Sequence, residues 1–175
     1  MIAAPRRRSL AVALLALAAV TVVGCSDKNV RKPAELKDIS NPEIRLRTEW
    51  TASSGNGGDK YYTELTLSLG ADALFAADVD GRIFAFDPKT GSRIWRTDTR
   101  KRVVSGPTVA GDAVLAGTMD GELVAVKRAD GTPLWKIRLA SEALSPPAGE
   151  GDRVFMRSGD GKIYGLEAQS GAQQW

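Results

Sequence analysis

A period of 40 residues runs through the chain from about residue 65 to its last position. Four positions of this period keep their residue type in three successive copies, namely Asp72, Asp112 and Asp152; Asp80, Asp120 and Asp160; Gly91, Gly131 and Gly171; and Trp95, Trp135 and Trp175. Chance does not hold four positions in register over three copies, and repeats of about 40–45 residues are typical of propeller blades. The sequence therefore predicts an all-β fold, a partial β-propeller of four-stranded antiparallel blades with about three repeats.

Turn signals divide each copy into four strands. In the second copy we expect strands over residues 105–110, 113–118 and 122–127, and a last one from Trp135 to Leu139. Asp120-Gly121 supplies the hairpin between the second and third strands, because both residue types tolerate a positive φ. The third strands of the three copies are apolar at every position, over residues 83–86, 123–126 and 163–166. A sheet packed between two neighbouring sheets needs such a pattern.

The recurring glycines and tryptophans are interpreted as structural residues of the blades. The third position of each third strand is small, and its residues are Ala85, Ala125 and Gly165. A small residue there leaves room for a tryptophan of an adjacent blade to pack flat. Taken singly, each tryptophan is explained by ordinary core filling, but their strict spacing predicts a contact repeated between blades.

The first 24 residues have the order of a secretory signal peptide. Arg6, Arg7 and Arg8 precede an uncharged, apolar run over residues 9–23, which is shorter than a comfortable membrane span. The run ends in Val22-Val23-Gly24-Cys25, which resembles the lipobox of bacterial lipoproteins. That resemblance implies that Cys25, the one cysteine, is lipidated and anchors the chain to a membrane.

The segment behind Cys25 is expected to be a tether and then a strand. Ser26 follows the cysteine, and by the enteric sorting rule this resemblance implies the outer membrane, with the domain facing the periplasm. Residues 25–43 are polar and contain two prolines, which predicts a flexible tether. Alternation of apolar and charged residues from Ile44 to Trp50 predicts a half-buried strand. The propeller part is expected over residues 44–175.

The small excess of positive charge belongs to the leader. The chain has 24 Lys and Arg against 21 Asp and Glu, and the leader holds three of the bases and no acid. Residues 25–175 therefore carry 21 bases and 21 acids. Nucleic-acid binding, which needs a persistent basic surface, is not predicted.

Residues 85–95 match the tryptophan-docking motif A-x-D-x-x-T-G-x-x-x-W of quinoprotein-type propellers. Later copies keep the Gly and Trp but replace Asp87 and Thr90. WD40 repeats share the period but need a histidine, which this chain lacks. The leader, the tether segment over residues 33–36, the repeat and residues 142–145 together resemble the BamB family, lipoproteins of the outer-membrane β-barrel assembly machinery. The resemblance implies an intact propeller of about eight blades. This chain is then an amino-terminal fragment, in which the strand over 44–50 lacks its partner.

The resemblance further implies a non-enzymatic scaffold with no cofactor. Its expected partners are the barrel-inserting component of the assembly complex and unfolded outer-membrane proteins. Loops between blades lie at the same end as the Asp-Gly turns, which places residues 98–104 and residues 140–145 together with those turns. The candidate partner-binding residues are Arg100, Lys101, Arg102, Glu142 and Leu144. An ordinary solvated loop explains the three bases equally well.

Two other functions share this repeat. A quinone-dependent periplasmic dehydrogenase would need a calcium cluster, a catalytic carboxylate and, in many cases, a vicinal disulfide. The single cysteine does not provide the disulfide, and the recurring acids are explained as turn formers, so no catalytic, cofactor or metal residue is predicted. The other alternative is a propeller serving as a binding module of another envelope complex, because a fold alone does not give a function.

Overall fold

A computed structural model describes residues 33–37, 40–41 and 43–175. The predicted signal peptide and Cys25 lie outside the described residues, as does most of the predicted tether. The chain divides into two units, residues 1–45 and 46–175. The described residues of the first unit form no helix or strand. Within the described part of the chain, no helix is long and apolar enough to cross a membrane.

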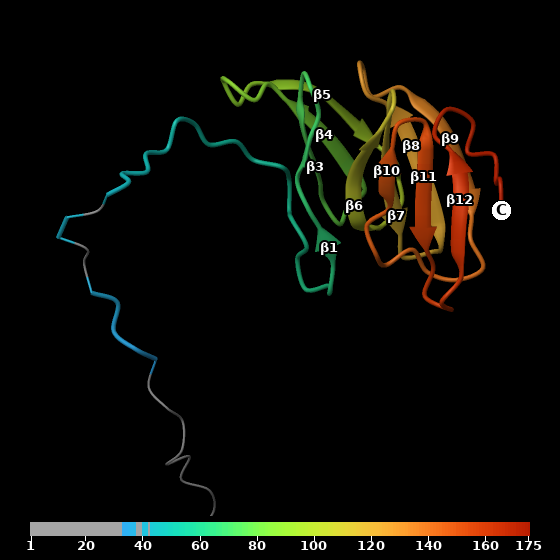
Figure 1. The fold of residues 1–175 in the computed structure, drawn as a ribbon, viewed down its shortest axis with the longest axis horizontal. Helices are drawn as coiled ribbons and strands as arrows, with labels where there is room; N and C mark the ends of the chain where they lie inside the picture. The colour runs from blue at the N-terminus through green and yellow to red at the C-terminus, as the bar shows by residue number, and fades with distance from the viewer. Residues whose placement is uncertain (1–32, 38–39, 42) are drawn as a thin grey trace, which may run out of the picture. The chain divides into compact units, whose positions relative to one another are not determined.

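The second unit consists of three sheets, each built mainly of antiparallel strands that follow one another along the chain (Figure 1). The first sheet contains β2 (Ser68–Leu69), β3 (Leu74–Ala77), β4 (Arg82–Phe86) and β5 (Arg93–Asp98). The second contains β6 (Val103–Ala110), β7 (Ala113–Thr118), β8 (Glu122–Lys127) and β9 (Pro133–Arg138). The third contains β10 (Ala148–Glu150), β11 (Arg153–Arg157) and β12 (Ile163–Glu167). The all-β prediction is confirmed.

The predicted strands of the second copy agree closely with the structure. β7 and β8 have the predicted bounds, β6 begins two residues earlier than expected, and β9 covers 133–138 where 135–139 was expected. In the third copy, the fourth strand is reduced to one bridge between Leu166 and Gln173.

The prediction of a strand over residues 44–50 is wrong. These residues have no regular secondary structure, because no strand edge among the described residues pairs with them. A strand that was not predicted, β1 (Glu64–Leu65), instead joins the second sheet. It pairs in parallel with β6, Glu64 opposite Ser105 and Leu65 opposite Gly106. The segment over residues 64–69 therefore connects the first two sheets.

The core lies between adjacent sheets. One cluster joins the first and second sheets and includes Phe75, Ile83 and Val114, and a second joins the second and third sheets and includes Leu115, Leu123 and Met156. All six side chains are buried. Each such side chain contributes about 1.5–3 kcal/mol by leaving water, so the packing of sheet on sheet is a large source of stability. The prediction that the third strands are apolar on both faces for this reason is confirmed for β4 and β8.

Each docking tryptophan lies on the glycine turn of the following sheet. Trp95 Nε1 donates a hydrogen bond to Arg128 O at 3.0 Å, and Trp135 Nε1 donates one to Ala168 O at 2.8 Å. A Cβ on Gly131 would lie 2.6 Å from the Trp95 ring, and one on Gly171 would lie 2.7 Å from the Trp135 ring. The predicted structural contact between blades is therefore confirmed for Trp95 and Trp135, and for Trp175 it stays a prediction.

Two details of that contact differ from the expectation. The small residues of the third strands face the tryptophan of their own sheet, since Ala85 pairs with Trp95 and Ala125 with Trp135. The neighbouring blade contributes the glycine turn instead. Trp50, which lies outside the 40-residue period, makes the same contact: its Nε1 donates to Pro88 O at 3.0 Å and its ring lies against Gly91.

Candidate protein-interaction surface

The loops between sheets and the Asp-Gly turns gather at one end of the propeller unit, which we call the turn end. Met119 N donates to Arg102 O at 2.9 Å, and Gly159 N donates to Glu142 O at 2.9 Å. Arg102 and Glu142 are thus equivalent positions of successive copies, each bonded to the turn of the following sheet. The expected proximity of the loops over 98–104 and 140–145 to the turns is confirmed.

Buried polar side chains hold the turns between the second and third strands in place by hydrogen bonds. Asp78, Thr118 and Ser158 occupy one position of the repeat and are buried. Asp78 Oδ1 accepts a hydrogen bond from Arg82 N at 2.9 Å, and Thr118 Oγ1 accepts one from Glu122 N at 2.9 Å. Because these bonds satisfy the backbone at the start of β4 and β8, the turns present a rigid surface.

Of the three predicted basic partner-binding residues, Lys101 is the one that forms ion pairs within the described part of the molecule. Its Nζ lies 3.0 Å from Glu122 Oε2 and 3.8 Å from Asp120 Oδ2. Glu122 is buried and also lies 3.5 Å from Arg138 Nη2. The Lys101 ammonium holds the pKa of Glu122 below its usual value. Contact between Lys101 and a partner stays a prediction, but its charge is already compensated by this pair.

Arg100 and Arg102 differ from Lys101, because neither forms an ion pair with a described residue. Arg100 is exposed and its backbone has a φ of 55°, which is stabilised by a hydrogen bond from its N–H to Asp98 Oδ1. Arg102 lies over the ring of Tyr61, with 4.3 Å between Cζ and the ring centroid. Tyr61 was not predicted as a site residue, because it precedes the repeat and no local pattern links it to Arg102.

Glu142 and Leu144 also lie at the turn end. Ser141 Oγ donates to Glu142 Oε2 at 2.5 Å, and this hydrogen bond lowers the pKa of the Glu142 carboxyl. Leu144 is 45% exposed, which is unusual for a leucine beside the buried Ala143. An exposed leucine near the polar loop residues of the turn end resembles the apolar centre of a protein-interaction surface with a polar rim.

The recurring aspartates lie in turns at both ends of the sheets. Asp72 precedes β3 and Asp80 follows it, so these two sets are separated by the length of a strand. Asp160 Oδ1 accepts hydrogen bonds from Ser158 Oγ and from Lys162 N, which is the work of a turn former. Among the described residues, no group of three His, Cys, Asp or Glu is placed to hold a metal ion.

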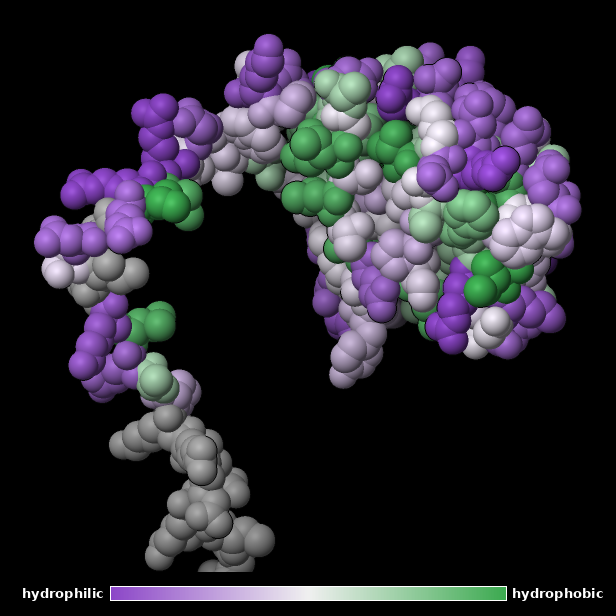
Figure 2. All heavy atoms as spheres, viewed as in Figure 1, coloured by the Kyte–Doolittle hydropathy of each residue, from purple (hydrophilic) through white to green (hydrophobic). Residues whose placement is uncertain are grey.

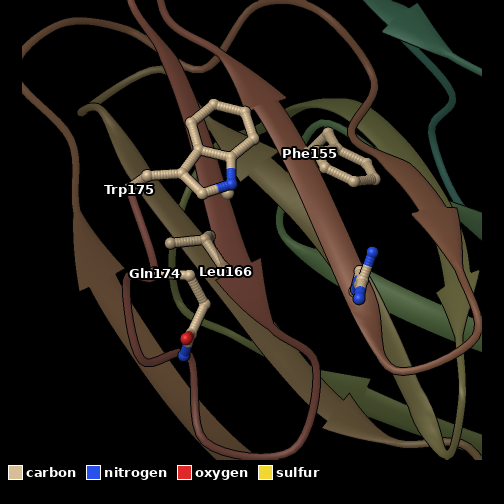
Figure 3. Close-up of a pocket in the computed structure, with 6 residues that line it drawn as sticks. Phe155, Leu166, Gln174 and Trp175 are labelled. Carbon is tan, nitrogen blue, oxygen red and sulfur yellow. The ribbon is translucent and has the colours of Figure 1, made fainter.

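The third sheet has an apolar outer face. The ring centroids of Phe155 and Trp175 on this face lie 6.0 Å apart. With Leu166 and Gln174, these two residues line a cavity of about 310 Å³ (Figure 3). Ile163 on β12 is 57% exposed, although its equivalents Ile83 and Leu123 are fully buried. Figure 2 shows apolar side chains over the last sheet among largely polar surroundings.

Comparisons with known proteins agree with the repeat. A family model described as outer membrane protein assembly factor BamB matches residues 79–175. The outer membrane protein assembly factor BamB of Pseudomonas aeruginosa is 39% identical over 96 residues, which are 54% of this chain and 25% of that protein. The chain thus spans about a quarter of the length of the curated relatives that it matches.

Solved structures give the same fold. BamB from Moraxella catarrhalis matches with a TM-score of 0.58 and 30% identity, over 63% of this chain and 34% of that chain. Quinohemoprotein alcohol dehydrogenase ADHIIG from Pseudomonas putida HK5 matches with a TM-score of 0.53 and 16% identity, over 65% and 26%. The second likeness shows the fold alone. Together they confirm the predicted partial β-propeller with quinoprotein-type repeats.

Proposed function

Because the chain belongs to the family of the outer membrane protein assembly factor BamB, we propose that it acts as a scaffold in the β-barrel assembly machinery of the outer membrane. In this role it holds the barrel-inserting component and assists the insertion of unfolded outer-membrane proteins. The match over residues 79–175 is the observation that carries the proposal. The rigid turn end supports it, because loops fixed on a stable scaffold are suited to recognition.

The proposed role is non-enzymatic. The most regular residues of the repeat are used within the fold: the tryptophans dock on glycine turns, and the aspartates form turns. A purified, full-length protein that lacks a quinone absorbance but retains its assembly partner would agree with a scaffold. A bound quinone with substrate turnover would contradict this part of the proposal.

Site-specific crosslinking in cells tests the partner. A photoreactive residue at Leu144 reports on the turn end, and one at the exposed Lys89, in the turn between β4 and β5, reports on the opposite end. We expect the Leu144 probe to capture the barrel-inserting component and the Lys89 probe to capture much less of it. Capture from Lys89 alone, or of no assembly component from either position, would reject the proposed surface.

We also propose that Cys25 carries the lipid anchor that holds the domain at the outer membrane, facing the periplasm. Incorporation of a labelled fatty acid should occur in the native chain and be lost in Cys25→Ala. When the cells are fractionated, Cys25→Ala should then be found in the soluble fraction and not with the membrane. Equal labelling of both chains would show that the anchor lies elsewhere.

A further inference from the structure

We infer that Arg102, stacked on Tyr61 beside Lys60, is a binding site for a carboxylate on an acidic segment of a partner protein. We call Lys60, Tyr61 and Arg102 the tyrosine platform. The inference deepens the proposed function, on which it rests for the existence of a protein partner. It adds the chemistry by which that partner is recognised.

The stacking orients the guanidinium. Arg102 Cζ lies 4.3 Å from the centroid of the Tyr61 ring, and Nη1 lies 3.8 Å from Met119 Sδ. The backbone beneath is also fixed, because Arg102 O accepts the hydrogen bond from Met119 N. A guanidinium that lies over an aromatic ring still has N–H groups along its edge, and that fork matches a carboxylate in a bidentate geometry. Arg102 therefore loses little side-chain freedom on binding.

The platform carries uncompensated positive charge. Lys60 Nζ lies 5.7 Å from the same ring centroid, so two cations share one tyrosine. Neither cation has an acid within ion-pair distance among the described residues, although Asp59 and Asp98 are close in sequence. Lys101, next to Arg102, is by contrast neutralised by Glu122. A carboxylate bound by Arg102 would compensate a charge that has no ion-pair partner among the described residues.

A protein segment fits this site better than an anionic membrane surface. Attraction to lipid headgroups needs a cluster of several bases of one sign, whereas here acids such as Asp59, Asp98 and Asp120 are interspersed with the bases. Tyr62, the residue after Tyr61, is fully exposed and available to cover an apolar side chain of the ligand. The occupant is thus a segment that combines carboxylates with apolar residues.

Binding of a model peptide to the full chain tests the inference. The probe is a short fluorescein-labelled peptide that alternates glutamate with leucine, and its control has glutamine in place of glutamate. We expect Arg102→Gln to weaken binding about tenfold, because a charge-assisted hydrogen bond is lost. Arg102→Lys should weaken it nearly as much, since lysine keeps the charge but loses the fork. Tyr61→Leu should weaken it severalfold.

Matched controls separate this site from general charge. Arg96→Gln removes an exposed arginine in the middle of β5 and should leave peptide binding unchanged. Equal binding of the glutamine peptide, or unchanged binding after both Arg102→Gln and Tyr61→Leu, would overturn the inference. Binding to phosphatidylglycerol vesicles but not to the peptide would overturn it in favour of a lipid site.

The experiments distinguish a failure of the proposed scaffold function from a failure of the proposed carboxylate site. If the Leu144 crosslink to the barrel-inserting component is absent while the peptide still binds through Arg102, the proposed function is wrong and the carboxylate site stands. If the crosslink forms and is unaffected by Arg102→Gln, and the peptide does not bind, the scaffold stands and the site is rejected.

Discussion

At the scale of single residues, each docked tryptophan makes one polar and one steric contact with the following sheet. The indole N–H of Trp95 satisfies Arg128 O, and its ring occupies the space that a side chain at Gly131 would need. Gly131 also has a φ of 74°, which L side chains rarely adopt. The glycine and the tryptophan are therefore required together, and the copies that lose Asp87 and Thr90 of the motif still keep this pair.

Replacement of Gly131, compared with a matched control, separates the cost of its positive φ from the cost of filling the space beside the indole. Gly131→Ala should lower the free energy of unfolding by about 3 kcal/mol, from a strained backbone plus clashes with the Trp95 ring and with Thr97 Oγ1. Gly151→Ala is the matched control, because Gly151 has a φ of 57° and no atom within 4 Å of an added Cβ. It should cost only about 1 kcal/mol. Urea denaturation of the purified chains measures both, and equal losses would show that close packing of Trp95 and Thr97 on Gly131 contributes little.

The indole hydrogen bond can be tested by itself. Trp95→Phe keeps an aromatic ring but leaves Arg128 O without its donor, which should cost about 1–2 kcal/mol. Trp175→Phe should cost far less, because Trp175 is 61% exposed and its indole N–H donates to no described acceptor. A similar midpoint shift in urea for both variants would argue against the polar contact.

The Asp160 turn should respond to acid. Hydrogen bonds from Lys162 and Ser158 lower the pKa of Asp160 from 3.8 to about 2. Since the folded pKa is the lower one, the stabilisation is complete above about pH 4 and disappears as the pH falls towards 2. An NMR titration of the Asp160 carboxyl should show this low pKa, and in Lys162→Ala the pKa should rise. An unchanged pKa in that variant would exclude Lys162 as the main cause.

At the scale of elements, the segment before β1 takes the place of a neighbouring sheet. Trp50 docks on Gly91, and Val79 N donates to Gly57 O at 2.8 Å. Asn56 N donates to the buried Asp78 Oδ2 at 3.3 Å. Phe84 and Phe86, on the first sheet, are buried although no other sheet lies on this side of it among the described residues. An irregular segment therefore protects an apolar face.

Removal of Trp50, which anchors the segment before β1, should loosen the first sheet locally. Trp50→Ala is expected to speed amide exchange in β4 more than in β8, because only β4 loses its cover. The cost in unfolding free energy should be about 2–3 kcal/mol, below that of a fully buried tryptophan. Uniform acceleration in both strands would indicate global rather than local opening.

The sequence predicts elements well where their cause is local. β7 and β8 have the predicted bounds, because alternation and the Asp-Gly turn are read within one copy. Trp50 was missed because 45 residues, not 40, separate it from Trp95. Residues 44–50 alternate like a strand, but alternation cannot show whether a partner edge is available. β1 and the contact of Tyr61 with Arg102 depend on segments about 40 residues apart, which no local pattern records.

At the scale of the whole molecule, stability depends on the covering of each sheet by the next. Ile83, Leu123 and Ile163 occupy the same repeat position, yet the first two are fully buried and the third is 57% exposed. The difference arises from the neighbours and not from the residue type. In the described residues, β11 and β12 cover the second sheet, and only Trp175 and nearby residues lie on the outer face of the third.

This dependence predicts unequal costs for equivalent truncations. Leu123→Ala should lower the free energy of unfolding by about 3 kcal/mol, because it leaves a cavity between two sheets. Ile163→Ala should cost below about 1 kcal/mol, since half of its side chain is already in water. It should also reduce binding of a hydrophobic dye to the outer face of the third sheet. Urea denaturation and dye fluorescence on the purified chains measure both effects. A cost for Ile163→Ala close to that of Leu123→Ala would mean that this face is covered in solution.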